Sequence, residues 1–341
     1  MESALPQLRL TTPGRAPRAS RPAASCLHPR KEPTVKILVT PRSFGKTNPE
    51  LFDRLTQAGL EVTRNDTGGI LSAEQMRARL ADCQGVILGV DPLDASVLAA
   101  APQLKAVAKY GVGLDNIDLD ACKQRGIAVS RTVGANSNAV ADFALTLMLM
   151  VARRAALIDR RCRRKDWSKI TSIDLYGKTL GIIGLGAIGR LVAKRARGFD
   201  MKILGHDIAW DDAWAQQAGV ERADVDRICR ESDFITLHTV LTDETRHIIN
   251  ADRLAAMKRT AVLVNTARGG LIDEDALLAA LKEERIYGAG LDVFAQEPPA
   301  DPAWYELDNL VMGSHCSSST AGATATMGHM AVDNLLRDLG L

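Results

Sequence analysis

One short segment limits the fold of this chain more than any other, because residues 184–189 place three glycines in the pattern G-x-G-x-x-G. An apolar run at 179–183 precedes the pattern and predicts a buried strand, while residues 191–195 follow it and predict a helix. A strand, a glycine turn and a helix in this order form the context in which the pattern binds a dinucleotide. We therefore expect an α/β domain with a phosphate-binding turn at this point.

Each residue inside the turn has a predicted task. Gly184 permits the tight turn, Gly186 lets the backbone approach a pyrophosphate, and Gly189 lets the helix pack closely against the strand. Ala187 and Ile188 open the helix, whose first N–H groups are unpaired and lie at the positive end of the helix dipole. We predict that these five residues bind the phosphates of a cofactor.

An acidic residue stands where a dinucleotide site needs one, just after the next predicted strand at residues 201–205. This residue is Asp207, and His206 beside it is expected to make only local contacts. A carboxylate at this place accepts hydrogen bonds from the ribose hydroxyls and repels a 2′-phosphate. The sequence therefore predicts NAD as the cofactor in preference to NADP.

The length of 341 residues allows two domains, and the charge excludes some classes of partner. Residues 1–33 hold six of the 43 basic residues but only two of the 41 acidic ones, so the rest has a slight acidic excess. We expect no nucleic-acid partner and no membrane partner. The six cysteines are scattered without a CxxC pair, so we predict no metal site and a cytoplasmic protein with reduced thiols.

Residues 1–33 are rich in Pro, Arg, Ala and Ser and show no apolar periodicity. This composition predicts a disordered N-terminal tail. An Arg-rich, acid-poor start is also typical of an organelle transit peptide, although the repeated prolines oppose an amphipathic helix. The two interpretations stay open.

Apolar, partly β-branched runs alternate with helix-length segments along the rest of the chain, which is typical of parallel, doubly wound sheets. The first series of predicted strands covers residues 35–40, 61–63, 85–90 and 104–109. The second series covers the strand before the glycine turn and residues 201–205, 233–238, 261–265, 288–293 and 310–313. A single long helix is predicted for residues 137–160, between the two series, and a last helix begins near Ala321.

Six spaced segments resemble the D-isomer-specific 2-hydroxyacid dehydrogenase family, particularly its phosphoglycerate dehydrogenase-like branch. They are Tyr110–Asp118, Asn136–Asp142, Gly177–Leu180, Asn265–Gly270, Leu291–Phe294 with Glu297-Pro298, and Gly313–His315. Each segment alone could arise by chance, but together and in this order they are specific, and the resemblance extends from residue 35 to the end of the chain.

The resemblance implies an α/β fold of two doubly wound parallel-sheet domains. A flavodoxin-like substrate domain would comprise residues 34–133 plus 316–341. A Rossmann NAD-binding domain, residues 134–315, would be inserted into it. The implied protein is a homodimer, in which the helix after Asn136 contributes to the contact between subunits.

Three residues are predicted to carry the chemistry of hydride transfer between a 2-hydroxy acid and NAD. The guanidinium of Arg268 can hold a carboxylate through two parallel hydrogen bonds. The imidazole of His315 can both take and give a proton near neutral pH. Glu297 would hold one ring nitrogen of this histidine, fix its tautomer and favour the imidazolium.

The same resemblance implies further contacts with cofactor and substrate. His238, Thr266, Ala267 and Asp292 would line the cofactor site, with Asp292 receiving the nicotinamide carboxamide. The backbone of Val112 and Gly113 would meet the substrate carboxylate. Lys109 and Tyr110 are further candidates for substrate contacts, and Arg268 completes that set.

One departure from the family bears on the substrate. Phosphoglycerate dehydrogenases often have an arginine soon after the third strand, where this chain has 88–92, Leu-Gly-Val-Asp-Pro. The absence of that arginine puts 3-phosphoglycerate in doubt and favours reduction of glyoxylate or hydroxypyruvate as an alternative to a phosphoglycerate dehydrogenase-like activity. An alternative of another class is an NAD-sensing, corepressor-like scaffold, since fold alone does not fix function.

Overall fold

The structure of the protein, a computed structural model, describes residues 35–341. The tail predicted at residues 1–33 lies outside the described residues. The strands form two sheets, and every pairing between neighbouring strands is parallel. Within the described part of the chain, no helix combines the length and the apolar character needed to cross a membrane.

The first sheet has five strands in the order β2-β1-β3-β4-β5, which is the order of flavodoxin-like folds. Its strands are β1 Val35–Val39, β2 Leu60–Arg64, β3 Gly85–Leu88, β4 Ala106–Lys109 and β5 Ala128–Arg131. The helices between them are α1 Glu50–Gln57, α2 Ala73–Leu80, α3 Ala95–Ala99 and α4 Leu119–Gln124. Polar caps fix where these helices begin: Ser72 and Gln75 form a capping box on α2, and Asp118 caps α4.

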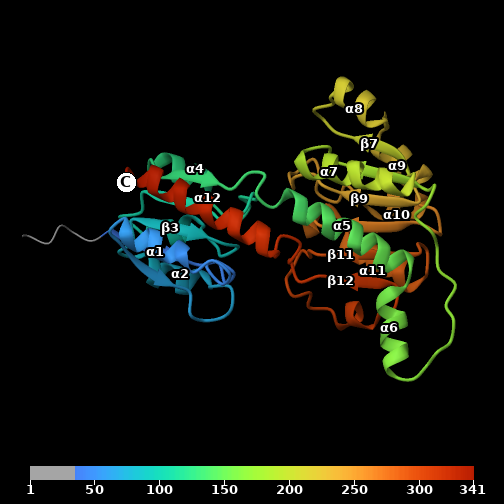
Figure 1. Ribbon diagram of the computed structural model, residues 1–341, viewed down its shortest axis with the longest axis horizontal. Coiled ribbons are helices and arrows are strands. Elements are labelled where there is room, and N and C mark those ends of the chain that lie inside the picture. The colour runs from blue at the N-terminus through green and yellow to red at the C-terminus, as the bar shows by residue number, and fades with distance from the viewer. Residues whose placement is uncertain (1–34) are drawn as a thin grey trace, which may run out of the picture. The chain divides into compact units, whose positions relative to one another are not determined.

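The last helix, α12 (Ala321–Leu339), belongs to this first sheet although it ends the chain. It contacts β3, β4 and β5, and Figure 1 shows its red ribbon lying along those blue and green strands. Met327 and Leu335 of α12 are buried in one core with Ile37 and Ile87. The packing is tight, because a Cβ on Gly85 would lie 3.0 Å from a methyl group of Leu335.

The second sheet has seven strands in the order β12-β11-β10-β9-β6-β7-β8. They are β6 Thr179–Ile183, β7 Lys202–His206, β8 Val220–Arg222, β9 Phe234–Leu237, β10 Val262–Asn265, β11 Gly288–Leu291 and β12 Leu310–Met312. Its connecting helices are α7 Ala187–Ala196, α8 Asp212–Ala218, α9 Val225–Glu231, α10 Ala251–Ala256 and α11 Glu274–Lys282. Short 3-10 helices cover Arg197–Phe199, Gly269–Leu271 and Pro302–Glu306.

Helix α5 (Ser137–Ala152) covers one face of the second sheet and contacts β10, β11 and β12 (Figure 1). Glycines in β11 let it approach closely. A Cβ on Gly290 would lie 2.8 Å from the Cβ of Leu147, and a Cβ on Gly288 would lie 2.9 Å from a methyl group of Val151. The small residues of this strand therefore set the distance between helix and sheet.

The single helix predicted for residues 137–160 is wrong, because the chain forms two helices there, α5 and α6 (Ala155–Arg163). Arg154 between them has a left-handed backbone with φ 51°. Its guanidinium lies 4.0 Å above the ring of Tyr287 and donates to the carbonyl oxygen of that residue at 3.0 Å. The buried face of α5 ends at Ala152, and no residue of α6 is buried, so the apolar packing against the sheet does not continue beyond this point.

In the second sheet, the chain leaves β6 toward β7 on one side and later returns to β9 on the other side of β6. Strand β6 lies between β7, which follows it directly, and β9. Ligands of open α/β sheets bind outside the carboxyl ends of the strands at such a point. The glycine turn at 184–189 follows β6 there, and the segments predicted to carry chemistry follow β9, β10, β11 and β12 at the same edge.

Candidate active site

The glycine turn leaves open space where a pyrophosphate would lie. Gly184 has φ 98°, and a Cβ there would lie 2.5 Å from the carbonyl carbon of His238. A Cβ on Gly189 would lie 2.0 Å from the oxygen of Gly184, so only glycine allows this packing. By contrast, a Cβ on Gly186 would meet nothing within 4 Å, and no side chain caps α7. The first N–H groups of that helix, at 187–188, are therefore free for a phosphate.

Asp207 lies against this turn, at the end of β7. Its carboxylate accepts hydrogen bonds from the N–H of Leu185 at 2.6 Å and from the N–H of Ala209 at 2.8 Å. Two apolar side chains not identified from the sequence lie on the strands that flank the turn: Ile208 after β7 is 97% exposed, and Val240 after β9 is 71% exposed. Both therefore expose apolar surface to solvent after strands next to β6. An apolar residue directly after Asp207, the acid predicted to bind the ribose, was the available sequence signal.

Buried polar atoms without a partner mark the next part of the site. Nδ1 of His238 and Oγ1 of Thr266, which follow the neighbouring strands β9 and β10, are two of the buried polar atoms that find no hydrogen-bond partner among residues 35–341. Burial lowers the pKa of His238 to about 3, so its ring is neutral at pH 7, with Nε2 at 2.9 Å from the hydroxyl of Thr236. Unpaired buried polar atoms are costly, so these atoms fit a site that a polar cofactor completes. Ala267, half-buried, follows Thr266 at the end of β10.

Asp292, directly after β11, fixes the turn that carries the predicted histidine. It is 1% exposed, and its two carboxylate oxygens accept hydrogen bonds from the N–H groups of Cys316 and Ser317, both at 2.9 Å. Its carbonyl oxygen accepts from the N–H of His315 at 2.8 Å. Gly313 must be glycine here, because a Cβ would lie 2.2 Å from the Asp292 carboxylate. The predicted contact of Asp292 with nicotinamide remains a prediction.

His315 and Glu297 form a close pair at the same edge. Nδ1 of His315 lies 2.9 Å from one oxygen of Glu297, whose other oxygen accepts from the N–H of Phe294 at 3.1 Å. Burial tends to raise the pKa of Glu297, but the hydrogen bond and charge of His315, the Phe294 N–H and the charge of Arg268 outweigh it, and the pKa is lowered. Glu297 is therefore an anion at neutral pH, and Nε2 is left as the ring nitrogen that faces away from it.

Arg268 is held in an extended conformation just beyond β10. The buried side chain of Asn265 donates to the carbonyl of Arg268 at 2.8 Å and accepts from the N–H of Ala267 at 2.9 Å. The guanidinium reaches the loop after β4: Nε donates to Asp115 at 2.6 Å, and Nη2 lies only 1.4 Å from where a Cβ on Gly113 would be. Asn265 and Asp115 were not predicted as site residues, although both lie within the quoted motifs.

Four substrate contacts were predicted at the end of β4 and in the loop after it. Two of them, Lys109 and Tyr110, have polar groups that already bind other parts of the protein. Lys109 is 5% exposed, and its ammonium donates to the carbonyl of Gly89 at 2.5 Å and to Asn116 at 2.6 Å. Burial, then the charge of Arg268, lower its pKa to about 8. Tyr110 packs against a phenylalanine of the core and donates its hydroxyl to the carbonyl of Thr324 in α12 at 3.1 Å.

The other two, Val112 and Gly113, are half-buried and lie beside Arg268, as the predicted carboxylate site requires. Arg268 is also close enough to help lower the pKa values of both Glu297 and Lys109. The structure thus places the guanidinium of Arg268 against the backbone of Gly113, and the imidazole of His315 against the carboxylate of Glu297. Such a set can orient an acid and exchange a proton with a neighbouring oxygen.

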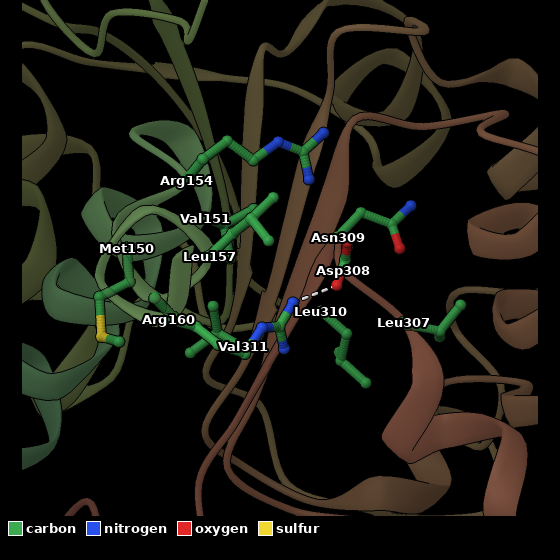
Figure 2. A pocket seen from close by; sticks show the side chains of 11 residues that line it. Met150, Val151, Arg154, Leu157, Arg160, Leu307, Asp308, Asn309, Leu310 and Val311 are labelled. Carbon is green, nitrogen blue, oxygen red and sulfur yellow. Dashed lines mark hydrogen bonds and ion pairs between the residues drawn. The ribbon is translucent and has the colours of Figure 1, made fainter. Parts of the chain in front are cut away.

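A different hollow, shown in Figure 2, is not part of this set. It is lined by Met150 and Val151 of α5, Leu157 and Arg160 of α6, and residues 307–311. Residues 307–310 lie at the amino end of β12, whereas His315 follows its carboxyl end. The ion pair of Arg160 with Asp308, drawn in Figure 2, ties α6 to this amino end.

Comparison with known proteins places this geometry in a family. The profile described as "D-isomer specific 2-hydroxyacid dehydrogenase, NAD binding domain" matches residues 145–317. The glyoxylate reductase of Korarchaeum cryptofilum is 44% identical over 266 residues, which are 76% of this chain and 80% of that enzyme. The D-3-phosphoglycerate dehydrogenase of Methanocaldococcus jannaschii is 40% identical over 309 residues, 89% of this chain and 57% of that enzyme.

Among solved structures, the TT0316 protein of Thermus thermophilus superimposes with a TM-score of 0.82 at 38% identity, covering 90% of this chain and 97% of that one. The predicted fold of two doubly wound parallel-sheet domains, one of them a Rossmann domain, is confirmed.

Proposed function

Because the chain belongs to the D-isomer-specific 2-hydroxyacid dehydrogenase family, and so to the NAD-dependent oxidoreductases that act on CH–OH groups, we propose that it reduces short 2-keto acids with NADH. Glyoxylate and hydroxypyruvate are the first candidates. The observation that carries the proposal is the position of Arg268 against Gly113, with the His315–Glu297 pair at the same edge of the sheet.

The residues divide the work of the reaction among them. The bound cofactor supplies or accepts the hydride. Arg268 binds the substrate carboxylate and fixes the orientation of the 2-carbonyl group. His315 holds a proton on Nε2 and gives it to the carbonyl oxygen during reduction, while Glu297, on Nδ1, keeps the ring oriented and balances its charge.

The end of β3 supports a substrate without a phosphate. Asp91 stands near the place where an arginine would help to hold one, and it is 3% exposed. Its carboxylate accepts hydrogen bonds from the hydroxyl of Thr40 and from the N–H of Leu71 at 2.8 Å, so it stabilises the fold and does not offer a phosphate site. Lys109, the buried cation nearby, already donates two hydrogen bonds. We therefore rank 3-phosphoglycerate below the short keto acids as a candidate substrate.

A panel of keto acids tests this proposal. Purified protein is given glyoxylate, hydroxypyruvate, pyruvate or phosphohydroxypyruvate, each with NADH and separately with NADPH. We expect the highest kcat/KM with NADH and one of the two first acids. Turnover of none of the acids would refute the reductase activity, and a preference for the phosphorylated acid would refute the substrate assignment.

A variant of the carboxylate-binding residue sharpens the test. Arg268→Lys keeps the charge but loses the planar fork, so we expect KM for the keto acid to rise about 10- to 100-fold. Arg337→Lys, on an arginine whose side chain is 64% exposed in α12, is the matched control and should leave KM unchanged. Equal KM values for the two variants would show that Arg268 does not bind the substrate carboxylate.

We further propose a homodimer and a cytoplasmic location. Helix α6 has no buried residue, and the segment after it exposes 81% of Trp167 and 71% of Tyr176. Large aromatic residues at such exposure are typical of surfaces that a partner covers, and a second copy of the chain is the partner we propose. Light scattering on the purified protein should give twice the mass of one chain, and a monomer would refute the dimer. Cell fractionation tests the location.

A further inference from the structure

We propose that Asp115 is a positioning residue for Arg268, and that it determines which edge of the guanidinium meets the substrate carboxylate. The inference rests on the proposed function, because it gives Arg268 the task of binding a carboxylate. Nε of Arg268 donates to Asp115 at 2.6 Å, across 153 residues of sequence.

The hydrogen bonds already made by Arg268 leave one edge for the substrate. A guanidinium has five N–H donors, which form two edges that can hold a carboxylate with parallel bonds: Nε with Nη2, and Nη1 with Nη2. Asp115 takes Nε, and the carbonyl oxygen of Ala267 takes one donor of Nη1 at 2.7 Å. Among residues 35–341, no hydrogen-bond partner engages Nη2. The end-on edge, formed by Nη1 and Nη2, is therefore the edge that can bind a substrate carboxylate.

The free nitrogen lies where the substrate carboxylate is expected. Nη2 occupies the space of a side chain on Gly113, 1.4 Å from the position of a Cβ, and the carboxylate of Asp115 lies 3.0 Å from the same position. Asp115 and the guanidinium thus meet beside the Val112–Gly113 backbone. A carboxylate bound there touches the end-on edge only if Asp115 keeps the side-on edge occupied.

Asp115 itself stands on a rigid support. The next residue, Asn116, accepts a hydrogen bond from the buried Lys109 ammonium at 2.6 Å. Its amide donates to the carbonyl of Asp91 at 2.5 Å and to the carbonyl of Gly89 at 3.2 Å. Three main-chain and side-chain partners thereby fix the loop next to Asp115. A rigid loop can hold a guanidinium in one orientation, which a flexible loop could not.

Stability alone does not account for the pair. The side chains of Arg268 and Asp115 are 31% and 48% exposed, and ion pairs at such exposure add little to the free energy of folding. An acid next to a carboxylate-binding arginine also weakens substrate attraction. Its presence is explained if orientation of the substrate, rather than strength of binding, is what it improves.

The test separates orientation from binding. Asp115→Asn keeps the shape of the side chain and removes its charge. Asp333→Asn is the matched control, because Asp333 of α12 forms an ion pair with Arg54 of α1 at 2.6 Å, and neither residue belongs to the candidate active site. For each protein we measure kcat and KM with the best keto acid, NADH affinity, the unfolding temperature, and the affinity of the NADH complex for oxalate, an unreactive dicarboxylate.

For Asp115→Asn we expect kcat to fall about tenfold or more, since a neutral amide oxygen holds Nε more weakly than a carboxylate does and a substrate carboxylate can displace it from the side-on edge. KM should not rise, and oxalate should bind about threefold to fivefold tighter, because a competing carboxylate has lost its charge. NADH affinity and unfolding temperature should stay unchanged. Asp115→Glu, which restores the charge, should recover part of the lost kcat, and Asp333→Asn should match the wild type throughout.

Three results with the Asp115→Asn protein would overturn the inference. They are an oxalate affinity that the Asn substitution leaves unchanged, a raised KM with unchanged kcat, and a parallel loss of NADH affinity and thermal stability. If the wild-type protein reduced no keto acid, the proposed function would fail, and the oxalate titration would still decide the role of Asp115. A wild-type NADH complex that binds no oxalate would overturn the inference, because Arg268 would then hold no carboxylate.

Discussion

Replacing Gly113 with alanine tests the candidate site at its tightest point. The new Cβ would lie 1.4 Å from Nη2 of Arg268 and 2.7 Å from its Cζ, so the guanidinium must move away. The side chain of Arg268 is 31% exposed and can swing toward solvent, so the fold should survive. The substrate carboxylate then loses two charge-assisted hydrogen bonds, each worth about 1.5–3 kcal/mol. The two bonds together are worth about 3–6 kcal/mol, which corresponds to a fall of at least about 100-fold and up to about 10,000-fold in kcat/KM.

The assay is the steady-state oxidation of NADH at several keto acid concentrations, together with thermal unfolding. Gly198→Ala is the matched control, because a Cβ on Gly198 would meet nothing within 4 Å. We expect the control to keep its kcat/KM, and both variants to unfold within about 2 °C of the wild type. A Gly113→Ala protein with kcat/KM within about threefold of the wild type would refute the proposed position of Arg268.

Three further predictions concern the other groups of the site. Glu297→Gln, which keeps the shape but not the charge beside His315, should lower kcat about 10- to 100-fold with little change in NADH affinity; equal losses in both would contradict its role. Asp207→Asn keeps an acceptor for the Leu185 N–H but removes the charge, so the NADPH-to-NADH ratio of kcat/KM should rise about tenfold, and an unchanged ratio would place the ribose elsewhere. In the folded protein the pKa of Lys109 is about 8 against an ordinary 10.5, so its ammonium destabilises the fold below pH 8, and the cost disappears as pH rises to 10.5. Urea unfolding of wild type and Lys109→Met should therefore shift by about 3 kcal/mol in favour of the wild type over that range, and a difference independent of pH would contradict the lowered pKa.

Much of the fold could be predicted because its strands are buried on both faces. All residues of β3, β9, β10 and β11 are buried, so their sequences are mainly apolar or small, with Thr236 and Asn265 as the polar exceptions. Two strands were missed, β5 (Ala128–Arg131) and β8 (Val220–Arg222), and both lie at the edge of their sheet. No residue of β5 is fully buried, and two of the three residues of β8 are exposed, so neither has an apolar signal.

The break after α5 was also beyond the sequence. At the break Arg154 stacks on Tyr287, a residue far along the chain, and no local pattern indicates this contact. Basic residues near a helix end were correctly recognised, but they fit a continuing helix as well as a turn.

The candidate site was predictable where a local motif carries the chemistry, and less so where partners come together from distant segments. The glycine turn and its neighbouring acid could be read from spacing alone. The contact of Arg268 with Asp115 joins segments 153 residues apart, so no local pattern indicates it. Tyr110 lies inside the substrate loop by sequence, yet its hydroxyl turns to α12, because the last helix of the chain covers that side of the first sheet.

The return of α12 to the first sheet sets an order on how the protein can be made. While the ribosome is still adding the second domain, β3 and β4 lack the helix that will shield Ile87 and Ala106 from water. That apolar face stays exposed to water until Ala321–Leu339 has been synthesised, long after the strands of its own sheet. A stop codon ahead of Met327 would therefore expose the core of the first sheet rather than that of the second.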